Sequence, residues 1–239
     1  NALSGEYLNN IDVIGSLRNP GQFEYSEGST VSDFINIETD LLDSTYTPIA
    51  LIKRFDSRTR SWKFVQFDLL NQNQLKKESL MPRDKIFIFS RSEVNFLSSY
   101  SVKTVVMGFD KEAERSQAEK LFNLKNLPAN NDELLAESIE DSSEFFYYSL
   151  VEQPCFKHLQ TYDQFFSDIF PVKLNALSES NSKKPSLCPD IFNSYPELLP
   201  YLLIQSAPVL GNVRLPGLYP VSPYVNAKDL LAYAGGILN

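Results

Sequence analysis

The chain carries the stretch Val-Ile-Gly-Ser-Leu-Arg-Asn-Pro-Gly-Gln-Phe at residues 13–23 and repeats it as Val-Leu-Gly-Asn-Val-Arg-Leu-Pro-Gly-Leu-Tyr at residues 209–219. Both stretches contain Gly-x-x-Arg-x-Pro-Gly. The offset is 209 − 13 = 196 residues, and it holds without a gap as far as Asp33 and Asp229. A shared string this particular indicates an internal repeat, which must be recognised before any fold is assigned.

The residues that the two copies share are typical of turns and close packing. Proline fixes φ near −65° and glycine can take a positive φ, so the Pro-Gly pair predicts a tight turn. Alternating apolar residues on either side predict two strands, so each copy begins with a β-hairpin. The motif residues that we expect to be structural are Gly15, Arg18, Pro20, Gly21, Gly211, Arg214, Pro216, Gly217, Gly235 and Gly236.

A short helix is expected after each hairpin. Ser29-Thr30 can cap a helix from about Val31 in the first copy, and Asn226 takes the capping place in the second. Ala-Gly-Gly at residues 234–236 suits a left-handed C-cap. The expected buried face of the second helix is Ala227, Leu230 and Leu231.

Only the first copy continues into further strands. Residues 48–54, 62–68 and 85–90 each have the composition of a strand. A hairpin, a helix and three strands predict an α+β domain with the helix on one face of the sheet. The counterpart of the third strand would fall beyond Asn239, so we expect the second copy to be cut short. A hairpin with one helix buries little surface, so we expect it to pack on the middle segment or to borrow strands from another molecule.

These motifs resemble the soluble-ligand-binding β-grasp (SLBB) family, in particular its members in outer-membrane polysaccharide export proteins. In that family a strand bearing Arg follows the helix, as Leu-Ile-Lys-Arg at residues 51–54 does here. Pro-Gly-Asp then precedes the last strand, and Pro82-Arg83-Asp84 matches it with Arg83 in place of Gly. The first copy also has Asn-Ile-Glu at residues 36–38 where Ala-Gly-Gly is typical.

The resemblance implies an α+β chain of three parts. These are a first β-grasp (SLBB-type) domain at residues 10–95, a mixed, largely helical middle segment at residues 96–203, and the first half of a second β-grasp domain at residues 204–239. Within the middle segment, residues 101–107 favour a strand and residues 177–189, rich in Ser, Asn and Lys, favour a loop. Helices are expected from Asp110 and from Asn131.

The charge of the chain restricts its partners. Thirty acidic against 22 basic residues give a net charge of −8, which is unfavourable for binding nucleic acid. It also argues against a charge-driven grip on an anionic polymer, so the basic pairs Lys53–Arg54 and Arg58–Arg60 are interpreted as solvated hairpin edges.

No run of about 18 apolar residues is present, so we expect no transmembrane helix. The start carries no signal peptide pattern, and we expect the chain to be a segment of a longer protein.

The two cysteines, Cys155 and Cys188, are not spaced as a metal motif. A zinc site needs about four clustered ligands, and the single histidine, His158, cannot complete one. The sequence therefore predicts no metal and no cofactor. In an oxidising compartment the two cysteines can form a disulfide, and the alternative is a pair of buried thiols.

Aromatic residues supply one candidate contact with sugar. Residues 145–148 read Phe-Phe-Tyr-Tyr, and Tyr147 and Tyr148 could stack on the CH faces of pyranose rings. The alternative is a buried face, which is favoured because four adjacent aromatics cannot all point one way. Trp62 lies within an alternating strand and is interpreted as structural.

Motifs of catalysis are absent from the sequence. It contains no GxSxG, HExxH, GxGxxG or P-loop string. The acid pairs Glu137/Glu140 and Asp141/Glu144 could serve a glycosidase in principle, but an acid-rich stretch is more simply a solvated helix end. We therefore expect a protein that is not an enzyme.

The resemblance implies a binding or scaffold module of capsule or exopolysaccharide export. It implies a periplasmic, outer-membrane-associated protein that forms homo-oligomers and contacts the polymer or other subunits of the export machinery. Three alternatives stay open at this point: a small-ligand receptor, a DNA-uptake protein, which the acidic balance opposes, and a carbohydrate-active enzyme in the middle segment.

Overall fold

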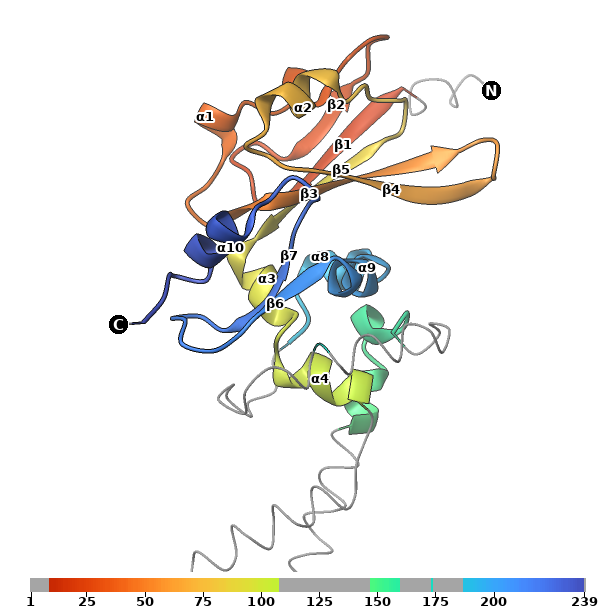
Figure 1. Ribbon diagram of the computed structural model, residues 1–239. Coiled ribbons are helices and arrows are strands. Elements are labelled where there is room, and N and C mark those ends of the chain that lie inside the picture. The colour runs from red at the N-terminus through yellow and green to blue at the C-terminus, as the bar shows by residue number, and fades with distance from the viewer. Residues whose placement is uncertain (1–8, 108–146, 160–172, 174–186, 239) are drawn as a thin grey trace, which may run out of the picture. The chain divides into compact units, whose positions relative to one another are not determined.

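The computed structural model describes residues 9–107, 147–159, 173 and 187–238 (Figure 1). The chain divides into two compact units, which are described separately below. The first unit joins residues 1–97 with residues 205–239, and the second contains residues 98–204. The first unit therefore brings both copies of the repeat together, and the part of the middle segment that follows residue 97 forms the second unit.

The first unit is built around an open five-stranded sheet with the order β2-β1-β5-β3-β4. Its strands are β1 (Asn10–Gly15), β2 (Gly21–Glu24), β3 (Thr45–Asp56), β4 (Ser61–Phe67) and β5 (Lys85–Ser90). β1 runs parallel to β5, and the other neighbouring pairs are antiparallel. The hairpin and the three later strands predicted from the sequence are thus confirmed, and the unit is of the α+β class.

One face of this sheet carries the main hydrophobic core. Figure 1 shows α1 (Ile37–Asp40) and α2 (Gln72–Lys77) on this side of the strands. Inward-facing residues of the strands meet Val31, Ile35 and Leu75 from the covering segments. The strand residues in this core are Ile11, Val13, Ala50, Ile52, Phe67, Ile86 and Ile88. Their alternation along each strand places the intervening residues on the opposite face.

The helical segments differ from the prediction in length and number. The helix expected from Val31 is a single 3-10 turn, η2 (Val31–Asp33), in which the Thr30 backbone N–H donates to the Asp33 carboxylate at 2.7 Å. A separate helix, α1, then begins after its own N-cap residue, Asn36. α2 was not anticipated; its cap is Asn71, whose side chain accepts from the Gln74 N–H at 3.1 Å. α3 (Arg91–Phe96) follows β5 directly.

Gly15 allows the parallel contact between β1 and β5. Its φ is +113°, and a Cβ at this position would lie 1.9 Å from the carbonyl oxygen of Ile88. The same oxygen accepts a hydrogen bond from the Ser16 N–H at 2.8 Å. No side chain larger than hydrogen fits between the two backbones at this point.

The second copy repeats the backbone of the first with the same offset of 196 residues. β6 (Ser206–Val209) pairs with β7 (Gly217–Pro220) so that Ser206 lies opposite Pro220, as Asn10 lies opposite Glu24 in β1 and β2. The N–H of Arg214 donates to Gly236, as the N–H of Arg18 donates to Asp40. The bridge between Val213 and Ile237 likewise repeats the one between Leu17 and Leu41. The repeat is therefore structural as well as sequential.

One position of the repeated hairpin differs in its ability to hydrogen bond. Asp12 of β1 donates its N–H to the carbonyl of Asp84 at 3.1 Å, and its carboxylate pairs with Lys85. Pro208 of β6 stands at the equivalent place. Proline has no N–H to donate. The edge of β6 therefore lacks a hydrogen-bond donor that β1 has at the same position.

The second copy packs on the first domain. The hydroxyl of Tyr46 donates to the carbonyl of Pro220 at 2.9 Å, and the Ser222 N–H donates to Pro48 at 3.1 Å. The rings of Tyr46 and Tyr233 lie 5.4 Å apart, and β7 packs against α3. From the sequence we expected the second copy to pack on the middle segment or to borrow strands from another molecule. Its packing on the first domain was not predicted.

The helix of the second copy, α10 (Ala227–Tyr233), begins as predicted but buries less than predicted. The Asn226 side chain accepts from the N–H groups of Lys228 and Asp229, which confirms the cap. Ala227 is exposed, however, and Leu230 and Leu231 are only half-buried. The predicted buried face was wrong at Ala227 because, within the described residues, no equivalent of the β3–β5 sheet covers this helix.

The second unit contains short helical segments. They are α4 (Tyr100–Met107), a 3-10 turn η4 (Pro154–Phe156), α8 (Asp190–Ser194) and α9 (Leu198–Ile204). The strand predicted at residues 101–107 was wrong. Ser99 caps a helix there, its Oγ accepting from the Val102 N–H at 3.3 Å, and Val102 and Val105 are buried one helical turn apart.

Several predictions for the middle segment fall outside the described residues. These are the helices from Asp110 and Asn131, the acid pairs between residues 137 and 144, and most of the loop at residues 177–189. Within the described ranges, no helix combines the length and apolar character needed to cross a membrane.

Candidate functional site

The shared motif residues lie in turns and at close backbone contacts. Gly235 has a φ of +78°, and a Cβ there would lie 2.9 Å from the Cβ of Arg214. The side chains of Arg18 and Arg214 are exposed beside their turns, as is Pro20. The motif thus shapes the hairpins and their connection to the following segment.

A buried ion pair links the Arg-bearing strand to the loop before β5. Nε of Arg54 donates to both carboxylate oxygens of Asp84 at 3.1 and 3.2 Å, and Nη2 donates to Oδ2 at 2.7 Å. Nη2 also donates to the Ser79 carbonyl at 2.7 Å, and Asp84 accepts from the Met81 N–H at 2.8 Å. The side chain of Glu78 lies 3.6 Å from Nη1. These polar groups satisfy one another's hydrogen-bonding capacity. The arrangement is that of a structural ion pair that holds β3 and the loop together.

The β3–β4 hairpin carries a group of aromatic and basic side chains, of which all but the half-buried Lys53 are exposed. Phe55 and Trp62 are register partners, each 45% exposed, with ring centroids 5.3 Å apart in an edge-to-face arrangement. Nζ of Lys53 lies 5.2 Å from the centroid of the Trp62 ring. Arg58 and Arg60 are exposed in the connecting turn. We name these five residues the hairpin cluster.

Sequence reasoning missed the hairpin cluster because it assigned Trp62 a structural role. The signal was present in the alternation of the strands. Ile52 and Val65 are core residues and register partners, so Lys53 and Phe55 belong to the opposite face with Trp62. Near the turn this face is solvent-exposed, which the sequence did not reveal.

The tyrosines proposed as a sugar contact lie in the second unit. Residues 147–151 are helical, Tyr147 is half-buried and Tyr148 is 56% exposed. Their ring centroids are 5.7 Å apart in an edge-to-face arrangement. Adjacent positions on a helix diverge by about 100°, so the pair does not present one flat surface. Phe145 and Phe146 lie outside the described residues.

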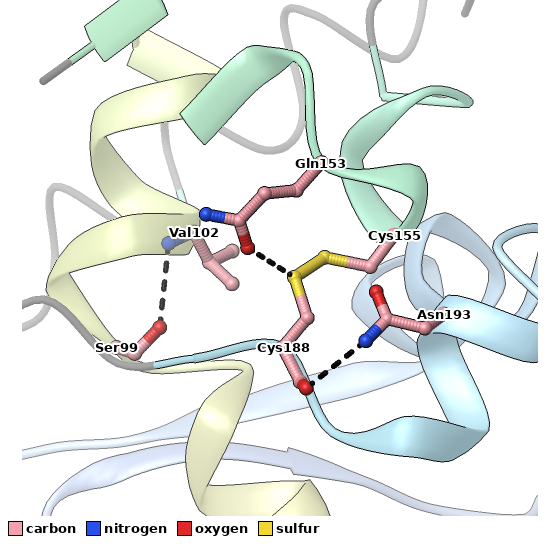
Figure 2. Close-up of a disulfide and its surroundings, with 6 residues drawn as sticks. All are labelled: Ser99, Val102, Gln153, Cys155, Cys188 and Asn193. Carbon is pink, nitrogen blue, oxygen red and sulfur yellow. Dashed lines mark hydrogen bonds between the residues drawn. A yellow bond between two sulfur atoms is a disulfide. The ribbon is translucent and has the colours of Figure 1, made fainter. Parts of the chain in front are cut away.

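Cys155 and Cys188 form a disulfide in the second unit (Figure 2). Their Cα atoms are 6.3 Å apart, within the usual range for a disulfide. Figure 2 shows Gln153 beside the bond, with its Oε1 3.1 Å from Sγ of Cys188. Asn193 donates to the Cys188 carbonyl at 3.3 Å. The bond joins the η4 turn to the start of α8.

Metal-binding groups are absent from the part of the chain that the structure describes. No three His, Cys, Asp or Glu side chains gather there as they would around an ion. The absence of enzymatic activity stays a prediction, because the acid pairs considered for catalysis lie outside the described ranges.

The first unit is an α+β structure with an open sheet and a repeated hairpin. Residues 207–239, which contain most of the second hairpin and α10, match the family model of the SLBB domain. This part of the chain is therefore similar to the SLBB domain, as the sequence resemblance predicted. The chain has no significant match among curated proteins, and none among solved structures.

Proposed function

We propose that the chain is a non-enzymatic binding and scaffold module of a polysaccharide export protein. The observation that carries the proposal is the SLBB match at residues 207–239, together with the first copy that repeats its backbone. An SLBB domain suggests a role in binding a ligand or polysaccharide. Two such copies in one unit suit a protein that lines or scaffolds a conduit.

The architecture of the first copy supports its assignment as a full β-grasp domain. β1 and β5 are parallel neighbours in the centre of a five-stranded sheet, and helical segments cover one face. In this proposal residues 10–95 form a complete module and residues 204–239 contribute the first hairpin and helix of another. Residues 96–203 then form a separate middle part.

The disulfide supports a periplasmic location. Disulfides form and persist in oxidising compartments, such as the bacterial periplasm, and are rare in the cytosol. The Cys155–Cys188 bond fits such a compartment. Association with the outer membrane, homo-oligomerisation and contact with other export subunits complete the proposal.

A glycan array that presents capsular and exopolysaccharide fragments tests this function with the intact chain. We expect binding to one or more polysaccharides without release of new reducing ends. A chain that binds none of them would contradict the proposed binding role. A chain that hydrolyses one would contradict the non-enzymatic assignment.

A further inference from the structure

We propose that the hairpin cluster is a binding site for an acidic polysaccharide. The inference rests on the proposed function and adds the place of contact and the charge of the polymer. It uses Lys53, Phe55, Arg58, Arg60 and Trp62, all on or beside the turn between β3 and β4.

The aromatic pair supplies the surface for a sugar ring. Phe55 and Trp62 are each 45% exposed, whereas Leu51 on the same face of β3 is completely buried. Together the two rings form an exposed apolar patch, and such a patch can mark a binding surface. The electron-rich face of an indole packs well against the polarised CH groups of a pyranose. Because β4 is an edge strand, Trp62 stands at the border of the sheet, where a long chain can pass.

The charge near the turn indicates an acidic ligand. Residues 53–63 contain five basic residues and one acidic residue, in a chain whose net charge is −8. Arg54 is paired with Asp84, and Lys63 with Asp56. Arg58 and Arg60 are exposed and have no ion pair within the described part of the chain. Their guanidinium groups can pair with carboxylates carried by successive sugars.

An acidic polysaccharide fits the cluster better than a membrane does. A hairpin that enters a bilayer carries its apolar residues at the tip, because apolar groups are the ones that leave water. Here the tip at residues 57–61 reads Ser-Arg-Thr-Arg-Ser, and the aromatic residues lie behind it. The arginines would meet the hydrocarbon region before the rings did.

An acidic polysaccharide also fits the hairpin cluster better than a nucleic acid does. A duplex carries about one phosphate charge per 1.7 Å, and the exposed Arg58 and Arg60 can neutralise only a small part of such a density. A polyuronic acid carries at most one charge for each sugar. Its rings also present the CH faces that the exposed indole can cover.

Trp62 is the only tryptophan in the chain, so its fluorescence reports directly on the cluster. We expect an oligogalacturonate of about eight sugars to change the emission of the intact chain saturably. Maltooctaose, a neutral oligosaccharide of the same length, should change it far less. Raising the salt concentration should weaken the oligogalacturonate complex, because exposed charges are screened.

Variants locate the binding by calorimetry. Trp62→Ala should lower the affinity for oligogalacturonate at least tenfold, and Arg58→Gln with Arg60→Gln at least fivefold. Lys76→Gln with Lys77→Gln is the matched control, since it removes two exposed charges from α2, on the core-covered side of the sheet. This control should bind as the wild type does.

Other results would overturn the inference. If Trp62→Ala binds as the wild type does, or only Tyr148→Ala loses binding, the cluster is not the site, while the proposed function stands. If maltooctaose binds as tightly as oligogalacturonate, the assignment of an acidic polymer is wrong. If phosphatidylglycerol vesicles or an oligonucleotide shift the Trp62 emission and oligogalacturonate does not, the partner is of another class. If neither oligosaccharide binds, the inference fails, whereas the proposed function fails only if the glycan array also shows no binding.

Discussion

Arg54 and Asp84, 30 residues apart in the sequence, form a buried bidentate ion pair that joins β3 to the loop before β5. In this chain the pair gives the Arg of β3 and the Asp before the last strand a shared structural role. Asp84 also accepts from the Met81 N–H, so the same carboxylate shapes the loop.

Replacing Asp84 by Ala should lower the free energy of unfolding by about 3–5 kcal/mol, since it removes the hydrogen-bonded carboxylate from a buried guanidinium and leaves it with the longer ion pair to Glu78. Urea unfolding followed by circular dichroism measures the change. Lys63→Met is the control, because it breaks the exposed pair with Asp56 and should leave the unfolding midpoint almost unchanged. Equal effects of the two substitutions would contradict the structural role of the buried pair.

Gly15 and its counterpart Gly211 should differ sharply in their tolerance of alanine. Gly15→Ala places a Cβ 1.9 Å from the Ile88 oxygen, whereas nothing lies within 4 Å of a Cβ at Gly211. We expect a loss of more than about 4 kcal/mol for Gly15→Ala. Gly211→Ala should lose only about 1–2 kcal/mol from its positive φ. Thermal unfolding compares them, and similar losses would refute the close contact of β1 and β5.

Arg83→Gly should stabilise the protein. Arg83 has a φ of +71°, a conformation that disfavours any residue with a Cβ. Glycine removes that strain, and we expect a gain of about 1 kcal/mol in the free energy of unfolding. Arg58 has no positive φ, so Arg58→Gly should give no gain. Differential scanning calorimetry distinguishes the two, and a lower melting temperature for Arg83→Gly would count against the argument.

The contact between the two copies should weaken in alkali. Burial, and then electrostatic repulsion from Tyr233 and Tyr219, raises the pKa of Tyr46 above its ordinary value of about 10. Above that pH the unfolded chain releases a proton that the folded chain keeps, so stability falls as the pH rises. Tyr46→Phe should cost about 1 kcal/mol at neutral pH and reduce this alkaline loss. Identical pH profiles for both proteins would exclude Tyr46 as the cause.

Removing the disulfide should loosen the second unit. Cys155 and Cys188 are 33 residues apart, and the entropy of such a loop corresponds to about 3–4 kcal/mol. Hydrogen exchange at the amides of Phe156 and Phe192, which report η4 and α8, should accelerate in the double Cys→Ser variant. The wild type under dithiothreitol should behave in the same way. Unchanged exchange in both would show that the bond does not stabilise these segments.

Local signals in the sequence were sufficient for the hairpins and the later strands. Pro20-Gly21, Pro216-Gly217 and the flanking alternation determine short-range geometry, and the constant offset extended that geometry to the second copy. The strand error at residues 101–107 arose because valine favours strands by propensity. The cap at Ser99 and the packing of Val102 and Val105 favoured a helix instead.

The hairpin cluster could not be found in the same way. Alternation shows that Phe55 and Trp62 share a face, but whether that face is covered depends on residues distant in sequence. The overall charge of −8 also argued against a site for an anion, because a sum over the chain hides a local excess of base at residues 53–63. The support for the second copy was missed for a similar reason, since the contact of Tyr46 with Pro220 spans 174 residues.

A chain that contains one hairpin twice can fold incorrectly by adding its later strand to the wrong copy. Asp12 offers β5 both an N–H for Asp84 and a carboxylate for Lys85. Pro208, at the same place in the second hairpin, offers neither. A β5 strand that docked on β6 would forfeit both bonds, so this single difference disfavours the exchange of strands between repeats that commonly traps repeated modules during folding.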